Sequence, residues 1–201
     1  MKDMFEEKSK DWDKNEMVNQ LSSEIGQSIL DNVELNAQMH VMDFGAGTGL
    51  ITSQVAPHVH KITAIDISQS MLEQLIAKQG LKNKVEILCQ DITTQPTKDK
   101  YDLIMSAMAM HHVQNTDNMI KQFSAHLKPG AKVALADLDK ENGSFHPEGT
   151  EGVYHDGFER SEFQTMLEKH GFKDINFFTA LTVAKNEKSY PVFLVLATKA
   201  A

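Results

Sequence analysis

The spacing of apolar residues changes once along the chain. From Val18 to Ile29 they recur at intervals of three and four, which predicts a helix over about 14–31 with one buried face. Beyond this point, short apolar runs alternate with stretches of helical periodicity. For example, 61-KITAID-66 is followed by 68-SQSMLEQLIAKQ-79, whose first serine can cap a helix. This part of the chain is therefore predicted to alternate strands and helices.

Seven of the apolar runs are predicted strands. The first ends near Asp43, and the others cover 61–66, 84–91, 101–110, 131–139, 173–185 and 188–199. Helical stretches between the earlier strands imply crossover connections, so these strands are predicted to be parallel with helices on both faces. The last two runs are joined so closely that they must be antiparallel. The predicted fold is a doubly wound, Rossmann-like α/β sheet of seven mostly parallel strands, with an antiparallel last strand and an N-terminal helical cap.

The end of the chain carries one more helix and one long irregular segment. Ser161 and Gln164 have the spacing of a capping box, and Gly171 can stop the helix that they begin. The segment 140–158 has no regular pattern, and such a segment inside a compact domain often covers a binding site. With 201 residues and no internal repeat or linker, the chain is predicted to be a single domain, 1–201.

Composition and charge narrow the classes of function. The formal net charge is −8 and no Lys/Arg cluster is dense, which disfavours nucleic-acid binding and attachment to anionic membranes. The longest apolar run, 192–197, is too short to span a bilayer, and the charged N-terminus lacks the pattern of a signal peptide. The single cysteine, Cys89, has no partner for an internal disulfide. We therefore expect a cytoplasmic protein.

The most informative stretch is 43-DFGAGTG-49, placed between the first strand and the first helix that follows it. A dinucleotide-binding turn would need glycine where Leu50 stands, and a phosphate-binding P-loop would need a lysine after the last glycine. The observed order, Asp43 followed by Gly45, Gly47 and Gly49, resembles the first motif of class I S-adenosylmethionine-dependent methyltransferases. A tight turn that needs glycine only for its φ angles is the alternative.

The resemblance implies a role for each residue of this motif. Without Cβ atoms at Gly45, Gly47 and Gly49, the amino acid and ribose parts of S-adenosylmethionine can lie against the backbone. Asp43 would meet the ammonium group of the cofactor, directly or through water. The resemblance extends over about 35–199.

Two further acids stand at predicted strand ends. Asp66 is implied to bind the ribose hydroxyls, with Ile67 and Met71 beside the adenine; a helix-capping acid is the alternative. Asp91 is implied to meet the adenine amino group, with Ile92 packed on the ring, and an ordinary loop acid is the alternative.

Other cofactor contacts are expected at the fourth strand and the N-terminus. Ser106 and Ala107 lie in the segment that resembles the fourth motif of the family, and they replace the Asn/Asp-Pro-Pro pattern of enzymes that methylate DNA amino groups. Trp12, with Phe5, is expected to form a roof over the cofactor, or else to anchor the first helix.

The acceptor side is expected to use histidines. His111, His112, His146 and His155 all fall in loops predicted at the carboxyl ends of strands, where ligands bind in open α/β sheets. The His-His pair resembles the small-molecule branch of the family, of the ubiquinone/menaquinone-biosynthesis type. Ordinary structural contacts are the alternative for all four.

The resemblance implies no metal, because similar catechol-type enzymes hold one on an acid after the fourth strand, and positions 106 and 107 carry no acid here. Asp137 and Asp139 are interpreted as strand-end acids. The expected function is methyl transfer to a small molecule by in-line displacement. The alternatives are a non-catalytic S-adenosylmethionine-binding regulatory or accessory protein and, more distantly, a dehydrogenase. In this interpretation, 1–34 is the cap, 35–139 the cofactor-binding half and 140–201 the substrate side. The acceptor, the methylated atom and the oligomeric state are left open.

Overall fold

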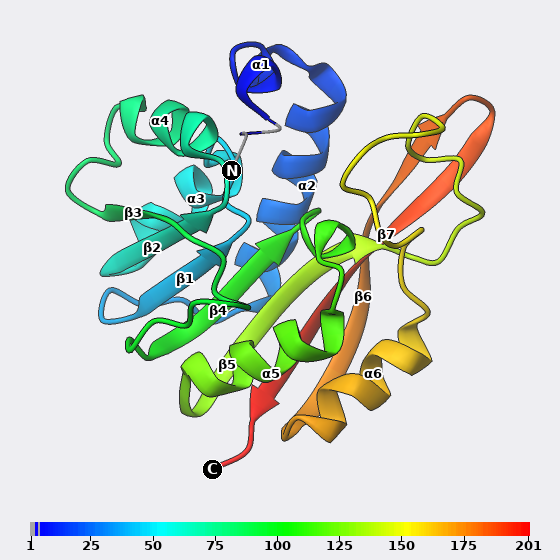
Figure 1. The fold of residues 1–201 in the computed structure, drawn as a ribbon. Coiled ribbons are helices and arrows are strands. Elements are labelled where there is room, and N and C mark those ends of the chain that lie inside the picture. Colours follow the sequence, from blue (N-terminus) through cyan, green and yellow to red (C-terminus); the bar gives the residue numbers. More distant parts are fainter. Residues whose placement is uncertain (1–2, 4) are drawn as a thin grey trace.

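The computed structural model describes residue 3 and residues 5–201, which form one seven-stranded sheet covered by helices (Figure 1). The strands are β1 His40–Phe44, β2 Lys61–Asp66, β3 Val85–Cys89, β4 Tyr101–Ala107, β5 Leu127–Leu138, β6 Phe172–Lys185 and β7 Lys188–Lys199. Their order in the sheet is β3-β2-β1-β4-β5-β7-β6. Strands β1 to β5 pair in parallel, and β7 runs antiparallel to both of its neighbours. The predicted fold class is confirmed.

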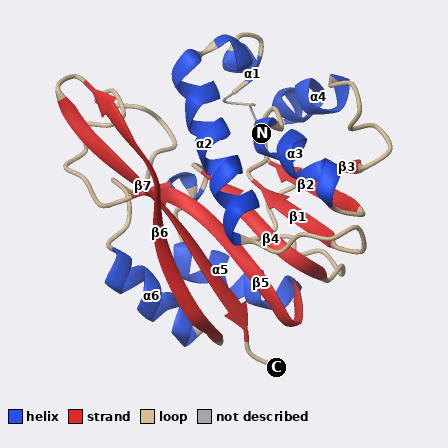
Figure 2. Cartoon of the chain, turned by 180° about the vertical axis from the view of Figure 1, so that it is seen from behind, coloured by secondary structure: helices blue, strands red, loops and turns tan. Residues whose placement is uncertain are grey.

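Helices cover both faces of this sheet (Figure 2). They are α1 Glu6–Ser9, α2 Glu16–Asn32, α3 Leu50–Val55, α4 Gln69–Ala77, α5 Thr116–His126 and α6 Arg160–Lys169, with short 3-10 turns at Trp12–Lys14 (η1), Ala56–His58 (η2) and Met110–His112 (η3). One buried apolar cluster joins the sheet to α2, α3 and α4, and a second joins it to α5 and α6. In β1, Val41 belongs to the first cluster and Met42 to the second, because successive side chains point to opposite faces.

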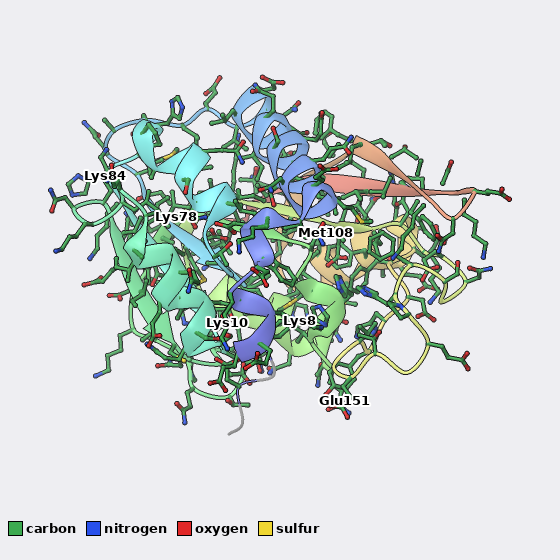
Figure 3. All side chains as sticks on the ribbon, turned by 90° about the horizontal axis from the view of Figure 1, so that it is seen from above. Lys8, Lys10, Lys78, Lys84, Met108 and Glu151 are labelled. Atoms are coloured by element: carbon green, nitrogen blue, oxygen red, sulfur yellow. The ribbon has the colours of Figure 1, made fainter. Side chains whose placement is uncertain are left out.

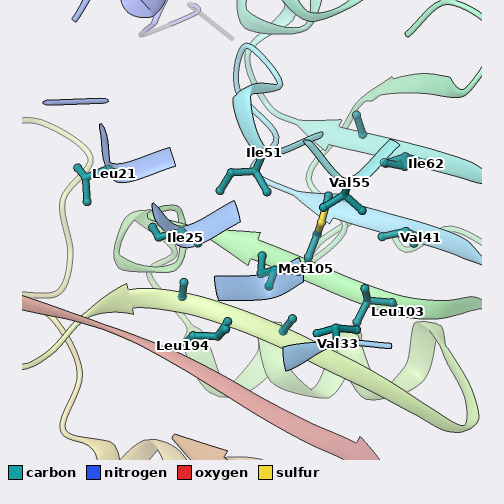
Figure 4. Close-up of a cluster of buried hydrophobic side chains, with 14 of the residues drawn as sticks. Leu21, Ile25, Val33, Val41, Ile51, Val55, Ile62, Leu103, Met105 and Leu194 are labelled. Atoms are coloured by element: carbon teal, nitrogen blue, oxygen red, sulfur yellow. The ribbon is translucent and has the colours of Figure 1, made fainter. Parts of the chain in front are cut away.

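The first cluster shows why α2 has the apolar spacing of its sequence. Leu21 and Ile25 on α2 point towards the sheet, near Met105 of β4 and Leu194 of β7 (Figure 4). Asn15 caps the helix by accepting a hydrogen bond from the Val18 backbone N–H.

One local prediction is wrong. Helix α6 begins at Arg160 after Glu159, which makes no side-chain cap, so Ser161 and Gln164 lie inside the helix and form no capping box. The guanidinium of Arg160 binds both carboxylate oxygens of Asp139, at 2.7 and 2.8 Å, and this ion pair fixes the start of the helix. The predicted stop at Gly171, where φ is 84°, is confirmed.

The topology determines where a ligand can bind. Strand order reverses at β1, which lies between β2 and β4, and open α/β sheets bind ligands at the carboxyl ends of strands beside such a reversal. The segment 140–158 lies beside the end of the β6–β7 hairpin (Figures 1 and 2), where Ser144 bonds the Tyr190 hydroxyl and Lys185 Nζ donates to the Phe145 carbonyl at 2.5 Å. No helix within the described part of the chain, residues 3 and 5–201, has the length and apolarity needed to cross a membrane.

Candidate functional site

A cavity of about 610 Å³ lies at the carboxyl ends of the parallel strands. Its walls come from the loops after β1, β2, β3 and β4, from the N-terminal segment and from the 140–158 segment. Seen from above, the N-terminal segment around Lys8 and Lys10 lies between Lys78, just after α4, and the loop that carries Glu151 (Figure 3). The predicted position of the binding site at this edge therefore coincides with a cavity.

The three glycines of the turn after β1 serve different purposes. All have positive φ, at 70°, 54° and 77° for Gly45, Gly47 and Gly49, which favours glycine at each. A Cβ on Gly45 would overlap the Cβ of Ala109, and one on Gly49 would come within 2.5 Å of Leu75 Cγ. A Cβ on Gly47 would meet no atom within 4 Å, because this residue faces the cavity. Close packing explains Gly45 and Gly49, whereas Gly47 alone leaves open space that a ligand can use.

Asp66 connects this turn to the next loop and also lines the cavity. Its Oδ2 accepts a hydrogen bond from the Gly47 backbone N–H at 2.8 Å, and its Oδ1 accepts one from Ser68 N–H at 2.9 Å. Burial raises the pKa of Asp66 above its ordinary value, although both of these hydrogen bonds act in the opposite direction. The carboxylate thus has a structural role in addition to the ribose contact that remains a prediction. The cap itself is Ser68, as expected from the sequence, and it accepts from Met71 N–H.

Asp43 lies beneath the turn and does not line the cavity. It is 4% exposed, and the Thr52 hydroxyl donates to its Oδ2 at 2.5 Å. Burial raises the pKa of Asp43 to about 7, with the nearby Asp66 carboxylate adding to the effect. A contact with the cofactor ammonium stays a prediction.

Only some of the residues predicted to contact the adenine line the cavity. Ile67, which is 54% exposed, Met71 and Asp91 line the cavity. Ile92 does not: it is fully buried in the cluster under α5. Thr93 and Thr94 line the wall instead, and Thr93 donates to Asp91 Oδ1 from both its backbone and its hydroxyl. No sequence pattern indicated these threonines, because the turn that Asp91 begins decides which following side chain faces inward.

The end of β4 contributes later residues than predicted. Ser106 is buried in the sheet and Ala107 lies outside the cavity wall, whereas Met108 and Ala109 line it. The strand continues through Ala107, and the chain turns into the cavity only at Met108, whose φ is 53°. Asn115 and Asn118, at the start of α5, also line the cavity and were not predicted from the sequence. Asn115 caps α5 by accepting from Asn118 N–H, a role that its position before the helix could have indicated.

The N-terminal segment is fastened over the cavity at two points. Phe5 and Trp12 line the cavity with ring centroids 6.3 Å apart. The Asp3 carboxylate accepts hydrogen bonds from the hydroxyl of Ser68 and from the backbone and hydroxyl of Ser70, at 2.8–3.0 Å. Farther along, the Asp13 carboxylate accepts from the Thr48 hydroxyl at 2.5 Å and pairs with Lys78 at 2.8 Å. Trp12 therefore lies where a roof was expected.

Three of the four predicted histidines lie together, and one lies apart. The ring centroids of His111, His112 and His146 are 4.2, 5.0 and 6.0 Å apart, whereas His155 stacks near Phe158. Of the four, His112 is the one that lines the cavity. Burial, followed by the two neighbouring imidazoles, lowers the pKa of His146 to about 4.

Asp137 acquires a role that the sequence did not indicate. It is fully buried, and its Oδ1 accepts from His111 Nδ1 at 2.7 Å and from Leu138 N–H at 2.8 Å. Asp139, the other strand-end acid, binds Arg160 instead. Among residues 3 and 5–201, no group of three or more His, Cys, Asp or Glu side chains converges so as to hold a metal ion.

Comparisons with known proteins agree with this geometry. A family model described as "Methyltransferase domain" matches residues 41–130. An uncharacterized methyltransferase of Schizosaccharomyces pombe is 28% identical over 136 residues, covering 63% of this chain and 48% of that protein. The ubiquinone biosynthesis O-methyltransferase of Coxiella burnetii is 32% identical over 106 residues, covering 50% and 44%. The chain thus spans about half the length of these curated relatives.

The fold is also similar to that of a solved structure with the expected product bound. The N-methyltransferase NodS of Bradyrhizobium japonicum, in complex with S-adenosyl-L-homocysteine, superimposes with a TM-score of 0.71 at 15% identity. The match covers 94% of this chain and 90% of that one, and at this identity it concerns the fold.

Proposed function

Residues 41–130 belong to the class I S-adenosylmethionine-dependent methyltransferase family, and from this premise we propose that the chain transfers a methyl group to a small-molecule acceptor. The observation that carries the proposal is the junction of Gly47 and Asp66 at the cavity wall. Gly47 leaves room for a ligand against the backbone, and Asp66 presents a carboxylate beside it.

The residues around this junction fit S-adenosylmethionine. Asp66 would accept the ribose hydroxyls, while Ile67 and Met71 offer apolar surface and Asp91 an acceptor for the adenine amino group. Trp12 would cover the bound molecule. S-adenosylmethionine supplies a methyl group on a sulfonium, which is a good leaving group, so the protein has mainly to align the acceptor and exclude water.

A small-molecule acceptor is supported by the cavity and by relatives. The named Coxiella burnetii relative acts in ubiquinone biosynthesis, and the cavity of about 610 Å³ is of the size that encloses a cofactor and a small acceptor. The acceptor would lie beside Phe5, His112 and Tyr154, which also line the cavity.

Calorimetric titration tests cofactor binding. We expect S-adenosylhomocysteine to bind and NADH not to bind. Binding of NADH without binding of S-adenosylhomocysteine would contradict the assignment of the cofactor and with it the proposed methyl transfer.

Labelled S-adenosylmethionine tests the class of acceptor. The protein is incubated with the labelled compound and fractionated cell extract, and we expect the label in the small-molecule fraction. Label only in protein or RNA would exclude a small-molecule acceptor. No transfer to any fraction, despite tight binding, would favour a non-catalytic regulatory role.

A further inference from the structure

We infer that His112 is the general base that takes the proton of the acceptor. The 140–158 segment determines which ring nitrogen of His112 carries a proton beforehand. The acceptor is an uncharged aromatic molecule with an ionisable hydroxyl. The inference rests on the proposed function and specifies its chemistry. In the reaction a lone pair of the acceptor oxygen would form the new O–C bond, while the hydroxyl proton would go to His112 Nε2 and the O–H bonding pair would stay on the oxygen. The C–S bonding pair would leave with the sulfur, which gives S-adenosylhomocysteine.

The contacts of His112 determine its tautomer. Its Nδ1 lies 2.7 Å from the Gly152 carbonyl oxygen, which can only accept a hydrogen bond. Nδ1 therefore carries the proton, and in the neutral ring Nε2 keeps its lone pair. Because the ring of His112 lines the cavity, this lone pair is the one that an acceptor in the cavity can reach.

The other histidines do not offer a base in the cavity. His111 is 1% exposed and is bonded through Nδ1 to Asp137, behind the ring of His112. His155 donates from Nε2 to the Val113 carbonyl at 2.9 Å, and neither it nor His146 contributes to the cavity wall. His111 and Asp137 are better explained as groups that hold the turn beneath His112.

The position of the Gly152 carbonyl depends on docking of the 140–158 segment. The backbone N–H groups of Tyr154 and His155 both donate to the His111 carbonyl, at 2.9 and 3.3 Å. Together with the His155–Val113 hydrogen bond, these contacts fix the segment on the turn that carries His112. A docked segment thus closes the cavity with Tyr154 and prepares the base at the same time.

The charged and titratable groups around His112 keep it neutral. Burial is the main factor that lowers its pKa, and His111 and Lys8 lower it further, while the Gly152 hydrogen bond and Asp137 raise it. His146 also lies near, with ring centroids 6.0 Å apart. A neutral imidazole of lowered basicity is better matched to the hydroxyl of a phenol than to the far less acidic hydroxyl of an alkyl alcohol.

The cavity wall agrees with an uncharged aromatic acceptor. Phe5, Trp12 and Tyr154 supply aromatic surface, and the amides of Asn115 and Asn118 supply neutral hydrogen-bonding groups. Within the described part of the chain, the wall contains no lysine or arginine that could balance a phosphate or carboxylate on the acceptor.

The tautomer can be measured without any acceptor. In protein labelled with ¹⁵N-histidine and saturated with S-adenosylhomocysteine, long-range ¹H–¹⁵N spectra distinguish the two ring nitrogens, and His112→Gln identifies the signal. We expect a neutral His112 with the proton on Nδ1 at pH 7. A proton on Nε2, or a charged ring, overturns the inference. Lack of S-adenosylhomocysteine binding would instead contradict the proposed function, and the same spectra of the free protein would still report the tautomer.

A chromogenic phenol tests proton transfer and acceptor class together. We expect 4-nitrophenol to bind the complex with S-adenosylhomocysteine and to show phenolate absorbance at a pH below its own pKa in water. His112→Gln should abolish this shift, whereas His58→Gln, at an exposed histidine away from the cavity, should behave as wild type. No binding of 4-nitrophenol, or an equal shift in His112→Gln, overturns the inference.

Activity supplies a third measurement. With labelled S-adenosylmethionine, His112→Gln should lower transfer to unionised phenols by about 10²-fold, and by much less to nitrophenols that are already ionised. Transfer confined to thioethers or tertiary amines, which have no proton to lose, would overturn the inference while leaving the proposed function intact.

Discussion

The two sides of the cavity are built differently. On the cofactor side, the wall includes two short stretches of chain, the turn 43–49 and the end of β2. The hydrogen bond from the Gly47 N–H to Asp66 joins them. On the acceptor side, the wall combines the N-terminal segment, the turn after β4 and the 140–158 segment. A substitution on the first side should therefore affect binding through one local contact. On the second side it should act through the docking of distant segments.

Gly47→Val should cause the largest effect on the cofactor side. A branched side chain would occupy open cavity space and strain a backbone with φ of 54°, so we expect no measurable binding of S-adenosylhomocysteine by calorimetry. Gly80→Val is a matched control, because Gly80 has φ of 87° and no atom near its missing Cβ, and it lies outside the cavity wall. Equal binding by both variants would refute the role of Gly47.

Asp43→Asn should change the pH dependence of stability. The folded-state pKa of about 7 exceeds the ordinary 3.8, so between these values the folded protein holds a proton that the unfolded chain does not. The free energy of unfolding of the wild type should therefore fall, relative to the variant, as pH rises from 4 to above 7, by on the order of 4 kcal/mol at most.

Denaturant titration across this pH range measures the difference between the two proteins. A constant difference would show that Asp43 is not protonated in the fold. The affinity of the same variant for S-adenosylhomocysteine tests the predicted ammonium contact, which a tenfold loss would support.

Asp66→Ala should weaken both cofactor binding and the free protein. Loss of a charge-assisted contact to the ribose should cost roughly 1.5–3 kcal/mol of binding free energy. The backbone N–H groups of Gly47 and Ser68 would also lose their acceptor, so the melting temperature of the free protein should fall.

Ser68→Ala separates the two effects. It removes the cap of α4, at about 1 kcal/mol, and one hydrogen bond to Asp3, but keeps the Asp66 carboxylate in the cavity and both hydrogen bonds from Ser70 to Asp3. We expect lower stability with nearly unchanged affinity. If Ser68→Ala loses as much affinity as Asp66→Ala, the ribose contact is not needed to explain the loss.

His155→Ala should have the smallest effect, on the acceptor side. It removes the hydrogen bond to the Val113 carbonyl, worth about 1 kcal/mol, and should loosen the 140–158 segment. We expect faster hydrogen exchange at the Tyr154 and His155 amides and several-fold slower methyl transfer, with unchanged affinity for S-adenosylhomocysteine.

His155→Gln, which keeps a donor, should restore part of the protection. Unchanged exchange in His155→Ala would show that the segment is held by its other contacts. A loss of S-adenosylhomocysteine affinity in His155→Ala would show that contacts on the acceptor side also support cofactor binding.

Sequence reasoning located the fold and the cofactor side because their signals are local. Alternating apolar periodicity predicts strands and helices from neighbouring residues, and the spacing of Asp43, Gly47 and Asp66 relative to strand ends places them at one edge. The errors on this side are shifts of one or two residues. Ile92 points into the core and Thr93 into the cavity, because the exact turn after a strand depends on packing against α5.

The sequence by itself determined that a sheet edge would carry glycines, acids and histidines, since chain order and periodicity place them there. Only the tertiary structure decided which of them face the cavity and in which protonation state. His112 was one of four candidate histidines in the sequence, and it differs from the other three by lining the cavity, with its Nδ1 bonded to a carbonyl 40 residues away. Such a contact depends on how the 140–158 segment packs on the turn after β4, which no spacing within either segment encodes. Short-range patterns reflect backbone geometry, whereas the identity of a base depends on contacts that only the folded chain brings together.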